Sequence, residues 1–188
     1  MEYQIKEITE EFISAINNYK ADFENFVINS FEIDCKELIY NSADKHICDS
    51  DYFVANFDKL KLIEKKPTIY WFEIDTRNHS PENLFNIFKD HKENKSKRNL
   101  PAIYTYHSET KVLYLGKSKS CLWGRLLLHL GFHDDKHSQG LVLNEWATKI
   151  NLKLTFNYIV FNEEMADLLA IYELKLAQKT KPLIGKHR

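Results

Sequence analysis

The second half of the chain alternates between short apolar runs and stripes of apolar residues at helical spacing. Runs at residues 101–107 and 111–116 predict two strands, and the short polar segment between them predicts a hairpin turn. Leucines and a tryptophan within residues 121–130 predict an apolar helix that ends at Gly131, because glycine commonly terminates helices. The same patterns then predict a helix over residues 141–150, a strand over 152–160 and a long helix over 163–179.

Helical spacing dominates the N-terminal third of the chain. Apolar positions recur at helical intervals in two successive stretches: Ile5, Ile8, Phe12 and Ile16, then Phe23, Phe26, Val27 and Phe31. Residues 66–74 are rich in β-formers and predict a strand. Ser80 is suited to an N-cap and Pro81 to the first position of a helix, so we expect a helix to begin there.

These elements predict an α+β protein with two regions. A charged stretch at residues 91–98 marks the expected boundary between them. Residues 1–97 are expected to form a mostly helical N-terminal region with one strand near residues 67–75. Residues 98–188 are expected to form a domain in which helices flank a small mixed or antiparallel sheet of three strands.

Composition excludes several classes of protein. Of the 188 residues, 44% are hydrophobic and 13% are aromatic, which is too apolar for a disordered chain. No apolar run reaches the roughly 18 residues that a membrane helix needs. The start of the chain is polar and lacks a signal-peptide pattern, and three widely spaced cysteines favour free thiols in a reducing compartment. We therefore expect a cytoplasmic protein.

The net charge of −1 hides an asymmetry along the chain. Residues 1–97 hold 13 Lys and Arg against 19 Asp and Glu, a net charge of −6, whereas residues 98–188 hold 13 against 8, a net charge of +5. A basic half favours an anionic partner, and nucleic acid is the partner that we expect. Scattered surface charge is the alternative that composition leaves open.

Charged residues lie on two helices that are otherwise rich in apolar residues. Arg125 and His129 share one stripe of the helix at 121–130, and Glu173 lies among small and apolar residues of the last helix. A buried guanidinium needs an anion, and a buried carboxylate needs a cation, a proton or a metal ion. One or two carboxylates with waters and phosphate oxygens typically bind Mg²⁺. The same residues also fit a structural arrangement in which Arg125 reaches solvent or pairs with Glu173.

Tyrosines and lysines on the two neighbouring strands supply further polar groups. Tyr104 and Tyr106 share one face of the first strand because side chains alternate, and Tyr114 lies on the second strand. Lys117 and Lys119 follow directly and have the reach to bind a phosphate. Each of these residues also fits an ordinary role, since tyrosines often pack at the rim of a sheet and lysines are usually solvated.

Together these residues resemble the GIY-YIG nuclease family, which is named after two tripeptides on adjacent strands. Here the tripeptides stand as Ala102-Ile103-Tyr104 and Tyr114-Leu115-Gly116. The similarity covers residues 98–188, and its spacing resembles that of the excision-repair nuclease subunit of bacteria. It continues through Lys117, through Arg125 and His129 on the following helix, and through Glu173 on the last helix, which Lys181 and Pro182 follow.

The resemblance implies both a fold and an activity. The family combines a small mixed sheet with flanking helices and hydrolyses phosphodiester bonds with Mg²⁺ or Mn²⁺. By position, Glu173 would bind the metal and Arg125 would stabilise the charge on the phosphate. Tyr104 would act as the general base or orient the attacking water.

Supporting roles fall to the remaining residues of the motif. Tyr114 and Lys117 would support the catalytic tyrosine, and His129 would assist proton transfer or position a tyrosine. Lys119 and Lys181 would join Lys117 in binding the substrate.

The sequence departs from the family pattern at two positions. Ala102 stands where the family has its first glycine, and Gly185 stands where it often has an asparagine that helps hold the site. We expect a Mg²⁺-dependent DNA endonuclease, with restriction, defence, mobile-element and repair roles open. The alternative is a nucleic-acid-binding protein of the same fold with weak or no cleavage. A homodimer is also left open.

Overall fold

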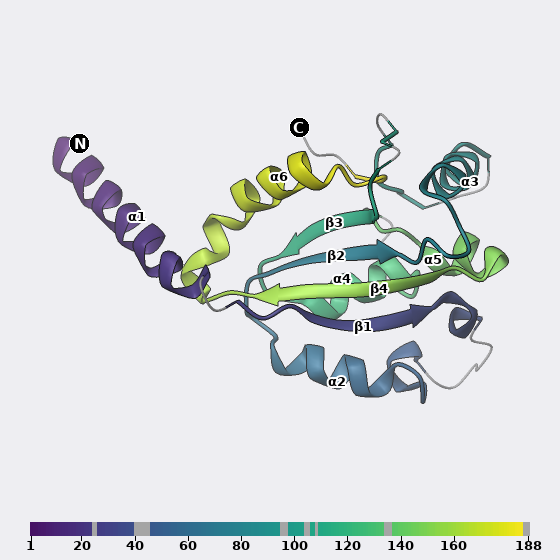
Figure 1. Ribbon diagram of the computed structural model, residues 1–188. Helices are drawn as coiled ribbons and strands as arrows, with labels where there is room; N and C mark the ends of the chain where they lie inside the picture. Colours follow the sequence, from purple (N-terminus) through teal and green to yellow (C-terminus); the bar gives the residue numbers. More distant parts are fainter. Residues whose placement is uncertain are drawn as a thin grey trace.

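A four-stranded antiparallel sheet with helices on both faces forms the body of the protein (Figure 1). The expected α+β class is confirmed, but the sheet has four strands rather than three. The structure is a computed structural model. It describes residues 1–23, 26–39, 46–94, 98–103, 106–107, 109–133 and 137–185.

The order of strands in the sheet differs from their order in the sequence. From one edge to the other, the strands are β1 (Asn29–Asp34), β4 (Lys153–Val160), β2 (Thr68–Ile74) and β3 (Val112–Ser118). β1 and β2 belong to the expected N-terminal region, whereas β3 and β4 belong to the expected C-terminal domain. The boundary expected at residue 97 therefore falls within a single sheet.

The described part of the chain contains six α-helices: α1 (Glu2–Phe23), α2 (Val54–Leu62), α3 (Pro81–Asn94), α4 (Leu122–Leu130), α5 (Leu143–Trp146) and α6 (Leu169–Thr180). α4 ends at Gly131, whose φ of 97° suits glycine, as the sequence predicts. The helix expected at residues 141–150 is α5 followed by a 3₁₀ turn. The long helix expected at residues 163–179 begins as a 3₁₀ turn and continues as α6. Within the described residues, no helix is both long and apolar enough to span a membrane.

β1 corrects the helical spacing expected around Phe31, although most of residues 1–62 are helical as expected. Phe31 and Ile33 pack toward the main core, while Ser30 and Glu32, which alternate with them, are exposed. This alternation is that of a strand with one buried face, and the strand pairs with β4 along its length. Pairing with β4 decides the structure here, because helical spacing of apolar residues is only a local signal.

The hairpin expected between residues 101–107 and 111–116 is wrong, because β3 pairs with β2 instead. Along the other edge of β3, Ile184 donates its backbone N–H to the carbonyl of Leu113 at 2.9 Å. Ile103 forms its isolated bridge with Ile184 and not with β3. The segment after α6 therefore lies where the hairpin partner was expected.

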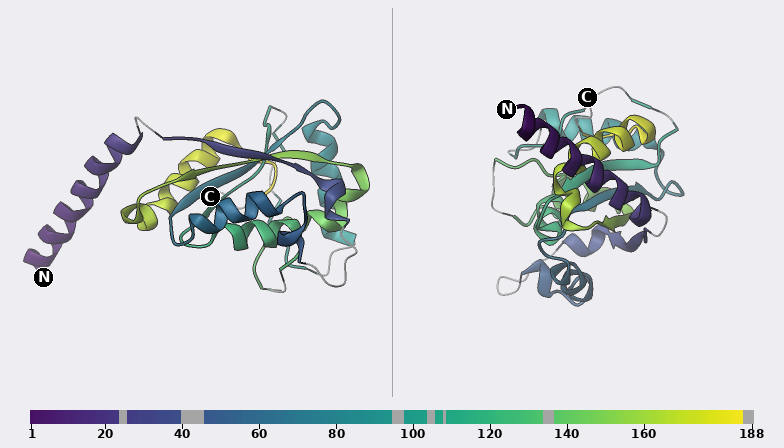
Figure 2. Two further views of the ribbon diagram at one scale, coloured as in Figure 1. Left: turned by 90° about the horizontal axis from the view of Figure 1, so that it is seen from below. Right: turned by 90° about the vertical axis from the view of Figure 1, so that its left-hand side faces the viewer.

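The two faces of the sheet carry different helices (Figure 2). α2 and α4 cover the face from which Tyr70, Phe72 and Phe156 enter the main core. α6 packs over β2 and β3 on the opposite face, where Ile69 and Ile159 belong to a smaller apolar cluster. β3 is thus the strand near which residues from α4 and α6 approach one another.

Candidate functional site

The hydroxyl group of Tyr70 is the centre of a polar cluster between the sheet and α4. Its oxygen lies 3.0 Å from Nε2 of His129 and accepts a hydrogen bond from Nε of Arg125 at 3.3 Å. The hydroxyl of Tyr114 is also hydrogen-bonded to Tyr70. Because Tyr70 itself is fully buried, these partners replace the water that would otherwise solvate its oxygen.

His129 holds Tyr70 through a defined tautomer. The backbone N–H of Leu141 donates to Nδ1 of His129 at 3.2 Å, so the proton of the neutral ring lies on Nε2 and is donated to Tyr70. Burial, together with the nearby Arg125, lowers the pKa of His129 well below its usual value. The ring is therefore neutral around pH 7. With both nitrogens occupied, His129 positions Tyr70.

Burial also sets the protonation of the two tyrosines. It raises the pKa of Tyr70, against the opposing effect of the Arg125 guanidinium. Burial raises the pKa of Tyr114 as well, and the neighbouring Tyr70 adds to the effect. Both hydroxyl groups are therefore neutral at physiological pH. For Arg125, burial lowers the pKa but the two tyrosines raise it more, so its pKa is raised and the guanidinium stays charged.

Gly116 gives Tyr70 the space to lie across β3. The two residues face each other in the register of β2 and β3. A Cβ atom at position 116 would lie 2.7 Å from the Tyr70 hydroxyl oxygen and 2.9 Å from Cε1 of Tyr114. Such contacts are far shorter than van der Waals distance, so the tyrosine pair in this position requires glycine.

Glu173 approaches the tyrosines from α6. Its carboxylate forms an ion pair with Lys117 of β3, and the two side chains are 18% and 33% exposed, respectively. The negative charge of Glu173 contributes to the raised pKa of both Tyr70 and Tyr114, although less than burial does. A carboxylate and an ammonium group are thus open to ligands beside the buried hydroxyl cluster.

The structural ion pair between Arg125 and Glu173, which the sequence also allowed, is not among the ion pairs of the described residues. Glu173 pairs with Lys117, and Arg125 donates to Tyr70. Arg125 also lines a cavity of about 200 Å³, together with Cys121, Gly124, Leu128, His133 and Ser138. The same residue therefore belongs to the tyrosine cluster and borders a space that could hold a ligand.

Tyr104, which was expected at the site, lies outside the described residues. Tyr106 and Lys119 have other partners. Tyr106 packs against Phe85 of α3, with ring centroids 5.4 Å apart. Lys119 forms an exposed ion pair with Asp167 at 2.9 Å. Among the lysines expected to bind substrate, Lys117 is the one that the structure places beside Glu173.

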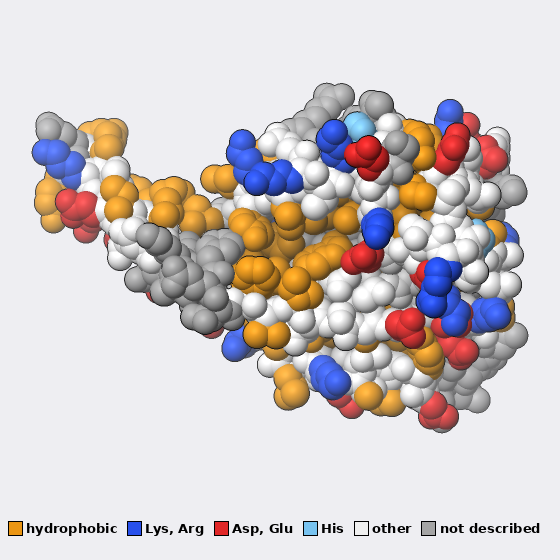
Figure 3. Space-filling model, viewed as in Figure 1, with side chains coloured by type: hydrophobic (Ala, Val, Ile, Leu, Met, Phe, Trp, Pro, Cys, Tyr) orange, Lys and Arg blue, Asp and Glu red, His pale blue; other side chains and the backbone are white. Residues whose placement is uncertain are grey.

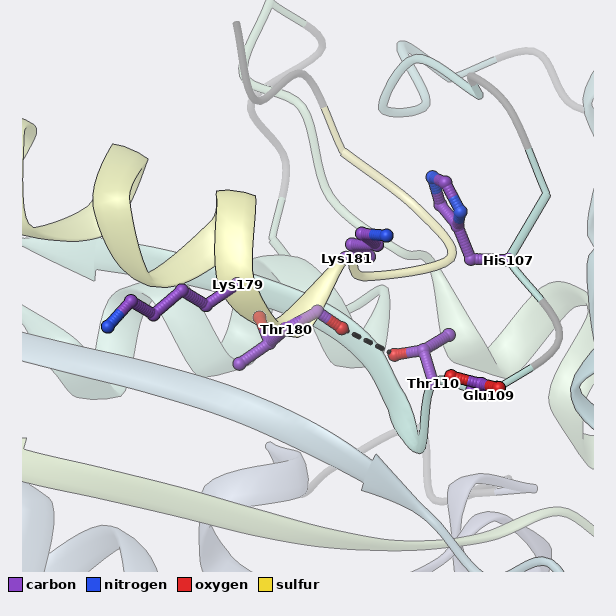
Figure 4. A pocket seen from close by; sticks show the side chains of 6 residues that line it. All are labelled: His107, Glu109, Thr110, Lys179, Thr180 and Lys181. Atoms are coloured by element: carbon purple, nitrogen blue, oxygen red, sulfur yellow. Dashed lines mark hydrogen bonds between the residues drawn. The ribbon is translucent and has the colours of Figure 1, made fainter.

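Lys181 lies in a groove beyond the C-terminal end of α6 (Figure 4). The groove has a volume of about 290 Å³ and is lined by His107, Glu109, Thr110, Lys179, Thr180 and Lys181. A hydrogen bond of 2.8 Å from Oγ1 of Thr110 to the carbonyl of Thr180 joins the start of β3 to the end of α6. Lys181 is thus about two helical turns, ~12 Å, beyond Glu173 along the helix.

Tyr70 is the functional candidate that sequence reasoning missed. The signal was present, because Thr68-Ile69-Tyr70 ends in the same two residues as Ala102-Ile103-Tyr104 and lies in a stretch already predicted to be a strand. What the sequence did not reveal is which of the two tripeptides pairs with Tyr114-Leu115-Gly116.

Comparison with known proteins adds no assignment to this geometry. No protein family, no curated protein and no solved structure matches the chain. The function is therefore argued from the residues that the fold brings together.

Proposed function

We propose that the protein is a metal-dependent endonuclease that hydrolyses phosphodiester bonds in DNA. The observation that carries the proposal is the convergence of Arg125, Glu173 and a buried tyrosine pair at the β3 edge of the sheet. Hydrolysis of a phosphodiester develops negative charge on the phosphate oxygens, and fixed cations and hydrogen-bond donors stabilise that charge. The basic excess of residues 98–188 favours an anionic substrate.

The arrangement fits the GIY-YIG resemblance with one change of residue. The two tripeptides of that family lie on adjacent strands, and β2 and β3 are adjacent here. We therefore take Thr68-Ile69-Tyr70 as the first tripeptide, on the strand beside Tyr114-Leu115-Gly116 and with Tyr70 opposite Gly116. Tyr70 replaces Tyr104 as the candidate tyrosine, and residues 75–111 become an insertion between the two strands.

Arg125 is the group best placed to bind the scissile phosphate. Its Nε donates to Tyr70, and a hydrogen bond with Tyr114 also helps to fix the direction of the guanidinium. Arg125 also lines a cavity of about 200 Å³, which offers space for a phosphate group beside this residue. A guanidinium that is held in place before substrate binds needs little reorganisation to stabilise the transition state.

The two tyrosines orient groups rather than remove protons. Burial keeps both hydroxyls neutral at physiological pH, and His129 and Arg125 fix the oxygen of Tyr70 in place. Because Tyr70 is fully buried, its hydroxyl acts by holding the Arg125 guanidinium in position. Tyr114, which is hydrogen-bonded to Tyr70, supports the same arrangement.

Glu173 is the residue that would hold a divalent cation. It is a single carboxylate, partly exposed and next to Lys117, so its charge is available to a ligand. One carboxylate fits Mg²⁺ or Mn²⁺ when waters and substrate phosphate oxygens complete the coordination. When bound there, such an ion would polarise a phosphate oxygen and lower the pKa of a bound water. Lys117, released from Glu173, would then be free to contact the phosphate.

Cleavage of supercoiled plasmid DNA with Mg²⁺ or Mn²⁺ tests the proposal. Glu173→Gln and Arg125→Lys are expected to lower the rate roughly 100-fold or more, the usual effect of removing one group that stabilises a transition state. Glu164→Gln and Arg77→Lys are matched controls, because both residues are exposed and belong to other parts of the surface. Thermal unfolding of each variant shows whether the fold persists. If Glu173→Gln and Arg125→Lys both cut as fast as the wild type, the site assignment is wrong.

A nucleic-acid-binding protein without efficient cleavage is the second candidate. The Lys117–Glu173 ion pair favours it, because the carboxylate already has a partner in the ligand-free protein. Gly185, at the position of the family asparagine, also removes one polar group from the pattern. Salt-sensitive DNA binding without cleavage in either metal ion would support this candidate over the nuclease.

A further inference from the structure

We propose that two copies of this chain associate through α1. This helix projects away from the sheet in Figure 1 and in the left view of Figure 2. Four of its apolar side chains are largely exposed: the exposed fractions are 58% for Ile5, 62% for Ile8, 46% for Phe12 and 48% for Ile16. The inference does not depend on the activity proposed above.

Four of the exposed apolar residues of α1 form one stripe. Ile5, Ile8, Phe12 and Ile16 follow one another at intervals of three, four and four residues, which places them on one face of the helix. Glu7, Glu10 and Ser14 occupy the opposite face. A regular stripe of this spacing is the surface with which a helix packs along a second helix.

The apolar surface is large enough for an interface. It continues past the helix through Phe26, Val27 and Ile28, which are 49%, 67% and 50% exposed. A large side chain presents on the order of 200 Å² when fully exposed, so the stripe with this segment offers roughly 600–800 Å² per copy. One partner in a standard protein interface contributes about 800 Å². Figure 3 shows hydrophobic side chains along the projecting helix and over the adjoining part of the body.

The charges of α1 favour a protein partner over a lipid surface or DNA. Glu7, Glu10 and Glu11 outnumber Lys6 between residues 5 and 16. Helices that bind membrane surfaces carry Lys and Arg on the polar face, and an acidic face is repelled by anionic lipid and by phosphate. A second copy brings an identical stripe. Around a two-fold axis, the stripe of one copy can pack against the stripe of the other.

Sedimentation equilibrium of the full chain between about 1 and 100 µM tests the proposal. The wild type is expected to move from the monomer mass of 22.3 kDa to twice that mass over this range. Ile8→Glu places a charge in the stripe and is expected to remain a monomer throughout. Ser14→Glu introduces the same residue on the opposite face and is the matched control, which should dimerise like the wild type.

Circular dichroism and thermal unfolding accompany each variant, measured at low concentration where all are monomers. Because α1 packs little on the body, Ile8→Glu and Ser14→Glu are expected to share the unfolding temperature of the monomeric wild type. A wild type that stays at the monomer mass at 100 µM overturns the proposal. So does an Ile8→Glu variant that dimerises as strongly as the wild type, and so does binding of monomers to anionic vesicles without self-association.

Discussion

Replacing Gly116 by alanine tests the packing on which the tyrosine cluster depends. The new Cβ would lie 2.7 Å from the hydroxyl oxygen of Tyr70 and 2.8 Å from its Cζ. Ordinary contact begins near 3.4 Å, so the end of the Tyr70 ring must move by about 0.7 Å or the strands must separate. Tyr70 has little freedom to move, because its ring is fully buried and its oxygen is bonded to Arg125 and His129.

The structure sets the size of the effect. A shift of the oxygen by that distance disturbs the geometry of the 3.0 Å and 3.3 Å contacts to His129 and Arg125. Two weakened hydrogen bonds to a buried group cost about 2–3 kcal/mol of the free energy of unfolding. For a domain of this size, that corresponds to a fall of about 5–10 °C in the unfolding temperature. If Tyr70 orients the reaction, the misplacement also lowers the cleavage rate by roughly 10- to 100-fold.

Thermal and urea unfolding of a double-mutant cycle measure the effect. Gly116→Ala is made in the wild type and in Tyr70→Phe, which lacks the hydroxyl but keeps Cζ. The cost of the alanine should be clearly smaller in the Tyr70→Phe background, because the hydrogen bonds are already absent there. Gly124→Ala is the control: its Cβ would meet the Cys121 side chain, and alanine favours a helix. An unchanged unfolding temperature for Gly116→Ala, or a cycle without coupling, would refute the reasoning.

Two further predictions follow from the pKa shifts in the cluster. Burial depresses the pKa of His129, so below pH 6.5 the unfolded chain binds a proton that the folded protein does not bind. His129 should therefore remove about 1.4 kcal/mol from the free energy of unfolding for each pH unit below that value. Urea titrations of His129→Gln between pH 7 and 5 should show a shallower loss than the wild type, and equal slopes would contradict the shift. Burial raises the pKa of Tyr70, so the stability that its protonated hydroxyl contributes is complete below pH 10 and is lost above it. Tyr70→Phe should therefore lose less stability than the wild type between pH 10 and 11.5. An identical loss would show that Tyr70 ionises as freely in the folded state as in the unfolded one.

Local sequence signals predicted strands and helices well where an apolar run or a terminating glycine marks the element. β2 and β4 lie within a residue or two of the predicted strands at 66–74 and 152–160, and α4 ends at the predicted glycine. β2 and β4 are central strands buried on both faces, so their apolar runs alone identify them. β1 was missed because its apolar residues also fit a helix, and its pairing with β4 spans more than a hundred residues.

Strand pairing was the part of the fold that the sequence could not decide. The prediction joined β3 to the nearest apolar run, as neighbours in sequence usually pair. The actual partner, β2, is separated from β3 by α3 and the segment around it. Apolar alternation shows that a segment forms a strand but carries no information about which strand lies beside it. Tyr114, Arg125 and Glu173 could be selected without this knowledge, whereas Tyr70 could not.

The charge asymmetry along the sequence has a different meaning in the folded protein. Because β1 and β2 of the acidic half alternate with β4 and β3 of the basic half, the two halves do not form separate bodies. Acidic and basic residues instead meet across the sheet, as in the ion pair of 3.2 Å between Asp34 and Lys153 on β1 and β4. The net charges of −6 and +5 therefore do not mark an acidic body and a basic one, and the argument for an anionic ligand rests on Lys117 and Arg125 themselves.

The protonation states of the cluster assign the chemistry to its members. Tyr70 and Tyr114 are neutral because they are buried, and His129 is neutral with both ring nitrogens engaged. None of these three groups can accept a proton readily near pH 7 in the ligand-free protein. Their common effect is to fix the Tyr70 oxygen and, through it, Arg125. In the proposed reaction, the proton of the attacking water therefore has to be accepted at Glu173 or at a group bound there. Glu173 is the partly exposed carboxylate that pairs with Lys117.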